Sequence, residues 1–192
     1  NGWEVSDSIP QPESSKIAIA WYEAKLEKTL AEIEDQFEKY RLSDALMAIY
    51  KLVWDDFCAW YLEMIKPGYE QPIDQATMDQ TIVFFEKLLC LLQPFTPFVA
   101  EELWHLLRER KEGEDIIIAK WPVVEAYDHA VLKQFVIAEE VVTNIRNIRK
   151  KNNIANKVRI ELFVKKNNEI DPAFDPVILK MGNLLIKSYN LL

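Results

Sequence analysis

The 192 residues are about half apolar and carry a net charge of −8, so the chain is long enough to bury one full core and part of a second. This acidity excludes a uniformly basic polyanion-binding protein. The charge is uneven, however: residues 1–127 hold 12 basic and 24 acidic side chains, whereas residues 128–166 hold 9 and 4. Binding to a polyanion follows such a local field, so the basic segment leaves a nucleic-acid interface open.

Cysteine usage and hydropathy point to the cytoplasm. Cys58 and Cys90 each lie in an apolar run and show no spacing typical of a disulfide framework or a zinc site, which is common in a reducing compartment. No apolar stretch reaches the length of a membrane span, and no signal peptide opens the sequence. The chain begins at Asn1 rather than Met, and we expect it to be a fragment of a longer protein.

The first two thirds of the chain predict a helix bundle. Residues 1–13, with two prolines and no periodicity, are expected to be a linker. Apolar residues then recur at steps of three and four, as in amphipathic helices. Expected caps are Ser14 or Ser15, Ser43 and Thr96, and Pro67 and Pro94 end helices. The resulting helices span about 14–40, 43–66, 74–92 and 97–110. Short connections between four such helices imply an antiparallel bundle over residues 14–127.

The remaining residues, 128–192, predict a long helix followed by a small α/β appendage that ends as if truncated. Before it, residues 116–122 are expected to be extended and to lie across the bundle. The long helix covers about 130–151, residues 157–164 alternate as a half-buried strand does, and 177–188 are expected to be helical. The fold class is therefore mainly α.

No constellation for covalent chemistry is found. The chain has no Ser-His-Asp set, no glycine-rich phosphate loop and no Cys-x-x-Cys. Glu102 and His105 form a Glu-x-x-His pair, as in di-iron bundles, but the other histidine, His129, has Ala126 three residues earlier. We therefore expect no metal site, no catalytic residue and no cofactor in this chain, and a bundle oxidoreductase is disfavoured.

Two motifs carry a family resemblance. Residues 54–66 read Trp-Asp-Asp-Phe-Cys-Ala-Trp-Tyr-Leu-Glu-Met-Ile-Lys, and residues 94–104 read Pro-Phe-Thr-Pro-Phe-Val-Ala-Glu-Glu-Leu-Trp. Together they resemble the anticodon-binding domain of class I aminoacyl-tRNA synthetases, and the valyl-tRNA synthetases most closely. Ala59 departs from the Asp that this family usually has. The aromatics Trp54, Phe57 and Trp60 are expected to pack in the core, because they follow a helical stripe.

The resemblance implies which residues meet tRNA. Trp21 matches a family aromatic that is thought to meet the anticodon loop, although its acidic and basic neighbours are replaced by Ile19 and Ala20. Stacking on a loop base and packing in the core both remain open for Trp21. Lys25, one turn later, would hold a phosphate or be solvated.

The end of the long helix is the second candidate contact with tRNA. Its four basic residues exceed what a helix C-terminus needs to oppose its dipole, which favours phosphate contact. They are Arg146, Arg149, Lys150 and Lys151.

The predicted function is binding of the anticodon stem-loop within an enzyme that attaches valine to its tRNA. The His-Ile-Gly-His and Lys-Met-Ser-Lys-Ser signatures are absent, so ATP with Mg²⁺ is expected to act in a separate catalytic part. We expect a monomer that binds tRNA, with no DNA and no membrane partner. The alternatives are a helical protein-interaction module, or the same domain of an isoleucyl or leucyl enzyme. A shared surface for Trp21, Lys25 and the basic helix end would favour RNA.

Overall fold

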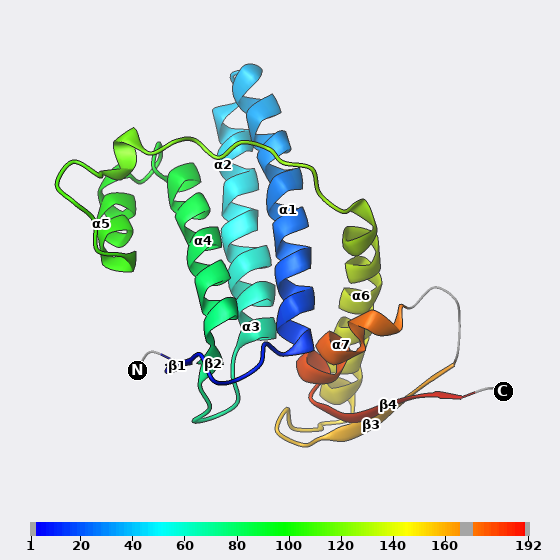
Figure 1. Cartoon of the computed structure of the whole chain (residues 1–192). Helices are drawn as coiled ribbons and strands as arrows, with labels where there is room; N and C mark the ends of the chain where they lie inside the picture. Colours follow the sequence, from blue (N-terminus) through cyan, green and yellow to red (C-terminus); the bar gives the residue numbers. More distant parts are fainter. Residues whose placement is uncertain (1–2, 166–170, 191–192) are drawn as a thin grey trace.

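The computed structural model describes residues 3–165 and 171–190, and most of them are helical. The bundle helices, in chain order, are α1 (Glu13–Glu38), α2 (Leu42–Lys51), the π-helix η1 (Leu52–Tyr61), α3 (Leu62–Ile65), α4 (Gln75–Leu92) and α5 (Pro97–Leu107). The longest later helix is α6 (His129–Lys151). Figure 1 shows α1 in the middle, with α2 and α4 on one side and α6 on the other. The predicted helix bundle followed by a small appendage is confirmed.

The core forms where α1 meets its neighbours. Tyr22 is fully buried, and its ring lies 5.3 Å from Phe57, 5.0 Å from Tyr61 and 5.0 Å from Phe84. These rings come from α1, η1 and α4, and such aromatic contacts stabilise a core beyond the area that they bury. The cluster holds the three elements together in the middle of the bundle.

Two of the predicted helix starts are wrong. α1 begins at Glu13 after Pro12, so Ser14 and Ser15 lie inside its first turn and are buried. α2 begins at Leu42 after Arg41, which places Ser43 inside that helix. Pro12 has an extended backbone with ψ 145°, so the helix starts only after it, and a serine signal alone does not fix the boundary.

The second predicted helix is one continuous run of α2, η1 and α3, but its middle is π-helical. The backbone N–H of Leu62 bonds the carbonyl of Phe57, five residues earlier. Leu52 and Phe57, also five residues apart, are consecutive buried positions of the segment. This change of period corrects the expectation for Trp54, which is 61% exposed and outside the core, whereas Phe57 is buried and Trp60 half-buried.

The connection from α5 to α6 crosses the bundle, as Figure 1 shows. Its start is not extended as expected: Ile116–Ile118 form a 3₁₀ turn, η2, and the extended part is residues 119–128, here called the strap. Glu27 of α1, buried in the bundle, anchors the strap. Its carboxylate accepts the backbone N–H of Glu125 at 2.8 Å and the Lys87 ammonium of α4 at 2.9 Å.

The appendage is a two-stranded parallel sheet with a helix between its strands. Its elements are β3 (Ile160–Lys165), the 3₁₀ turn η3 (Pro172–Phe174), α7 (Asp175–Gly182) and β4 (Leu184–Asn190). The expected helix over 177–188 is therefore wrong beyond Gly182. Asn183 takes a left-handed conformation with φ 49°, which ends α7, and the chain continues as β4.

Part of the segment that was expected to be a linker, residues 1–13, forms a short strand. β1 (Val5–Ser6) lies parallel to β2 (Ile73–Asp74), just before α4. Asp74 caps α4 by accepting the Thr77 N–H at 2.8 Å. Within residues 3–165 and 171–190, no helix combines the length and hydropathy that crossing a bilayer requires.

Candidate nucleic-acid interface

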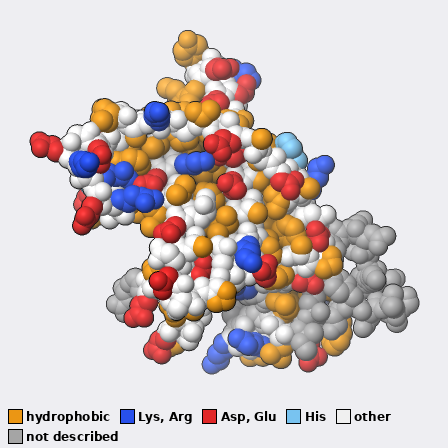
Figure 2. Space-filling view, viewed as in Figure 1, with side chains coloured by type: hydrophobic (Ala, Val, Ile, Leu, Met, Phe, Trp, Pro, Cys, Tyr) orange, Lys and Arg blue, Asp and Glu red, His pale blue; other side chains and the backbone are white. Residues whose placement is uncertain are grey.

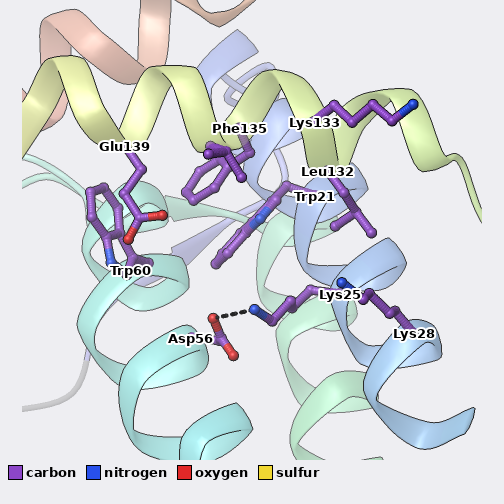
Figure 3. A pocket seen from close by; sticks show the side chains of 10 residues that line it. Trp21, Lys25, Lys28, Asp56, Trp60, Leu132, Lys133, Phe135 and Glu139 are labelled. Carbon is purple, nitrogen blue, oxygen red and sulfur yellow. Dashed lines mark ion pairs between the residues drawn. The ribbon is translucent and has the colours of Figure 1, made fainter. Parts of the chain in front are cut away.

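A pocket of about 210 Å³ lies where α1, η1 and α6 meet. Figure 3 shows side chains from all three elements converging on it. Its walls are aromatic and aliphatic, and charged groups stand at its rim. The lining residues are Trp21, Lys25 and Lys28 of α1, Asp56 and Trp60 of η1, and Leu132, Lys133, Phe135, Val136 and Glu139 of α6.

Trp21 forms one wall of the pocket from inside the bundle. It is only 3% exposed, and its ring stacks on Phe135 of α6 with centroids 3.9 Å apart and planes 20° from parallel. The structure therefore gives Trp21 a packing role between α1 and α6. Phe135 covers one face of the Trp21 ring. In this arrangement Trp21 shapes the pocket wall more than it offers an open face on which a base could stack.

The charged groups of the pocket are coupled. The Lys25 ammonium lies 3.1 Å from the Asp56 carboxylate, which is drawn as the dashed line in Figure 3. Burial raises the pKa of Asp56, and nearby Lys25 partly offsets this effect. Burial also raises the pKa of Glu139, again opposed by Lys25. Lys28 and Lys133 are exposed, and no ion pair is formed by either one within the described residues. Figure 3 shows Lys133 pointing away from the pocket.

Trp60 links this pocket to the basic end of α6. It lines the pocket beside Trp21, and the guanidinium carbon of Arg146 lies 5.3 Å from its ring centroid. This distance is within the range of a cation–π interaction. Trp21, Lys25 and Arg146 are thus brought to one continuous surface, because α6 carries both the pocket residue Glu139 and, two turns later, Arg146.

Beyond Arg146 the surface opens into a groove of about 600 Å³ between the end of α6 and the α7–β4 turn. Arg146 and Lys150 line it together with Asn156 and Asn183, and the neighbouring Lys151 is exposed. On the face seen in Figure 2, charges of both signs mix over the bundle, whereas basic side chains gather at the lower edge around the loop that joins α6 to β3. That loop carries the exposed Lys157 and Arg159. We call the groove and this loop the basic end.

Arg149 differs from the other basic residues of α6, because it is buried. It is 3% exposed and donates to four carbonyl oxygens, those of Ala155 at 3.3 Å, Val158 at 2.8 Å, Gly182 at 3.0 Å and Asn183 at 2.9 Å. In this geometry its guanidinium joins α6 to the appendage, and Arg149 lines the groove while its side chain stays almost fully buried. The structure thus places Arg149 beneath the groove as a support.

His105, which forms a Glu-x-x-His pair with Glu102 in the sequence, contacts two other carboxylates in the structure. The Nε2 atom of His105 lies 2.9 Å from Glu101 and 3.2 Å from Asp115, while Glu102 is not among these contacts. Glu101 also accepts the backbone N–H of Ile116 at 3.2 Å. These contacts hold the loop before η2 against α5, on the opposite side of the bundle from α6 in Figure 1.

The sequence did not single out several residues of the pocket. Asp56 is one of them, and it is paired with Lys25. Lys28 of α1 and Lys133 and Glu139 of α6 reach the same site because α6 packs against α1. Spacing within each helix gives their faces, but no pattern in the sequence says that these two faces meet.

A helix bundle with an aromatic-walled pocket and a basic helix end on one surface suits a protein that holds a nucleic-acid loop. The family described as the anticodon-binding domain of tRNA ligase matches residues 20–164, so the chain belongs to that family. The similar proteins are ligases for one amino acid, valine. A valine–tRNA ligase of Parabacteroides distasonis is 53% identical over 95% of the chain, and one of Christiangramia forsetii is 50% identical over 95%.

A more distant relative agrees with these two. The valine–tRNA ligase of Thermotoga maritima is 33% identical over 90% of the chain. The chain spans about a fifth of the length of the relatives that it matches, 21% of the first two and 20% of the third.

Proposed function

We propose that the chain grips the anticodon stem-loop of a valine tRNA, with the pocket beside Trp21 facing the loop and the basic end of α6 facing the backbone. The observation that carries this proposal is the contact of Arg146 with Trp60, because it joins an aromatic pocket and a row of cations on one surface. Unpaired bases need flat apolar walls and phosphates need exposed cations, and this surface offers both.

The residues divide into contacts and supports. The exposed cations Arg146, Lys150 and Lys151 contact phosphates, and Lys25 at the pocket rim does so once RNA competes with Asp56. Trp21, through its stack on Phe135, and Arg149, through its four carbonyl partners, hold the surface in shape. Trp21 therefore contributes to binding by setting the pocket wall.

The pocket also favours one kind of base. Glu139 makes no ion pair within the described residues, and Figure 3 shows its carboxylate directed toward Trp60. A carboxylate accepts hydrogen bonds and donates none when ionised. A base with an exocyclic amino group, as adenine, cytosine and guanine have, suits this wall better than uracil, which has none.

In the complete enzyme, this grip would place the acceptor end of the tRNA at a distant catalytic site, where ATP with Mg²⁺ drives the attachment of valine. The two nucleotide-binding signatures are absent from this chain, so the chain alone should form no valyl-tRNA. Such an enzyme would work in the cytoplasm, and we expect this part of it to be monomeric.

The test is the salt dependence of binding to an anticodon stem-loop hairpin. Replacing Arg146, Lys150 and Lys151 with Gln should weaken binding to all hairpins alike and flatten the log–log salt slope by about 2, since each loop phosphate contributes roughly 0.7. The matched control replaces Lys39, Lys66 and Lys120 with Gln, which changes the charge equally elsewhere on the surface. Equal slopes for the two triple variants would refute the assignment.

A further inference from the structure

The second helical run of the bundle presents an aromatic pair to solvent. Tyr50 and Trp54 are 54% and 61% exposed, and their rings lie within 15° of parallel with centroids 6.5 Å apart. Leu46, one turn earlier, and Met47 extend the apolar surface. We call these four residues the aromatic stripe. Exposed aromatics that adjoin one another in this way mark binding surfaces more often than scattered apolar residues do.

The π-helix bears on the exposure of Trp54 alone, because Leu46, Met47 and Tyr50 are already exposed within the α-helix α2. Within η1 the buried positions are separated by five residues, from Leu52 to Phe57, instead of three or four. Trp54, which lies between them, is turned outward to join Tyr50. A π-helical segment is less favourable than an α-helix, and such segments are found frequently at functional sites.

The stripe borders the surface already assigned to RNA. A furrow of about 420 Å³ runs between α1 and α2, and Lys25 and Asp56 line both this furrow and the pocket beside Trp21. Met47 and Lys51 line the furrow from α2. Met47 therefore belongs both to the furrow and to the stripe. The pocket, the furrow and the stripe are therefore continuous.

The charge along the furrow is mixed. Arg41 and Lys51 form no ion pair within the described residues, and both line the furrow. The carboxylates of Glu32 and Asp44 line it as well, so the furrow is no general polyanion site. Stacking surfaces with a few separate cations fit a single unpaired nucleotide, in which the base is apolar on its faces and only the phosphate needs a cation.

We propose that Tyr50 and Trp54 form a second stacking platform, which receives an unpaired nucleotide of the same RNA whose loop enters the pocket beside Trp21. Lys51 and Arg41 hold the phosphates on either side of that nucleotide. The platform rests on the proposed function, since it extends the same RNA-binding surface. Its ligand is a single-stranded nucleotide next to the anticodon stem, and its selectivity among the four bases is low because every base has an aromatic face.

The test compares Trp54→Ala and Trp54→Phe with the wild-type chain, using the anticodon stem-loop hairpin as the probe. Trp54→Ala should weaken binding by about 5- to 150-fold, the range for loss of one base–aromatic stack. Trp54→Phe should retain most of the affinity. The matched control is Tyr69→Ala, an aromatic residue that is 90% exposed in the loop after α3. None of these side chains is buried, so the thermal midpoints should agree.

A second measurement locates the nucleotide. Hairpins that carry 2-aminopurine at one unpaired position at a time should show, at one of these positions, fluorescence quenching by the wild-type chain that Trp54→Ala abolishes. If Trp54→Ala binds as the wild type does while the Arg146, Lys150 and Lys151 triple variant is weakened, the platform is refuted and the anticodon function stands. If neither variant is weakened, the proposed function itself fails. Loss of self-association with unchanged RNA affinity would make the stripe a protein contact and would also refute the platform.

Discussion

Arg149 either supports the fold or contacts a phosphate of the RNA, and its replacement by Met distinguishes these two roles. Methionine has a similar length but no hydrogen-bond donors, so Arg149→Met removes all four bonds to the appendage. The carbonyls of Ala155 and Val158 belong to exposed residues and regain water. The bonds to Gly182 and Asn183 lie deeper, and at about 1.5–3 kcal/mol for each charged bond the expected loss is about 3–6 kcal/mol.

Equilibrium unfolding in urea, followed by circular dichroism, measures this loss. The control is Lys150→Met, on the next residue, which is exposed and should change the unfolding free energy by about 0.5 kcal/mol or less. Amide hydrogen exchange should show where the loss falls, with faster exchange in β3 and in the turn after α7 for Arg149→Met only. These segments hold the carbonyl partners or adjoin them.

RNA binding supplies an independent measurement. A phosphate contact contributes roughly 0.7 to the log–log salt slope, so Lys150→Met should flatten the slope by about that amount. Arg149→Met should leave the slope unchanged under conditions in which the variant is folded, because its guanidinium faces carbonyl oxygens. Equal stabilities for the two variants, or a flattened slope for Arg149→Met, would refute the assignment of Arg149 as a support.

Trp21→Ala should lower the unfolding free energy by about 3–5 kcal/mol. The double variant with Phe135→Ala should lose less than the sum of the two single losses, because the two rings stack on each other, and calorimetry that finds the full sum would contradict this coupling. Glu27→Ala should cost about 2–3 kcal/mol by removing the acceptor of the strap, and limited proteolysis should then cut the strap faster than in the wild type. Burial raises the pKa of Asp56 and Glu139 above their ordinary values of 3.8 and 4.5, so the folded chain holds these protons at a pH where the unfolded chain has lost them. Their contribution to stability should therefore fall as the pH rises through and above these ordinary values, and unfolding of the Asp56→Asn, Glu139→Gln variant should depend less on pH in that range.

Local pattern predicted the helices but not the change of period within one of them. The stripe of apolar residues assigned Trp54 to the core, because the pattern assumed 3.6 residues per turn throughout. A π-helix bonds residues five apart, and its rotation carries Trp54 to solvent. Nothing in the composition of residues 52–61 distinguishes this from an ordinary buried α-helix. The motif identified the family, while the exposure of its first aromatic became visible only in three dimensions.

The site was predictable by residue type and less so by role. The basic end of α6 was evident from charge spacing, and the steps of three and four that link Val142 and Ile145 left either Ile148 or Arg149 on the buried face. Spacing could not show the four carbonyl partners that hold Arg149 there, because they lie beyond α6 in the chain. Likewise, Gly182 and Asn183 end α7 through a left-handed turn, whereas the apolar residues that follow favoured a longer helix. The division of the chain at residues 127 and 128 stays a prediction.

The central place of α1 has a consequence for synthesis of the chain. α1 contacts α2, η1, α3, α4, α6 and α7, and it is the first helix to be made. The face that holds Trp21 receives Phe135 more than a hundred residues later. At about 5–20 residues per second, that face waits roughly 5–25 s on the ribosome without its partner. During this interval the Trp21 ring lacks its stacking partner Phe135, so we expect the Trp21 face of α1 to stay open to other apolar contacts, those of chaperones included, until α6 has emerged.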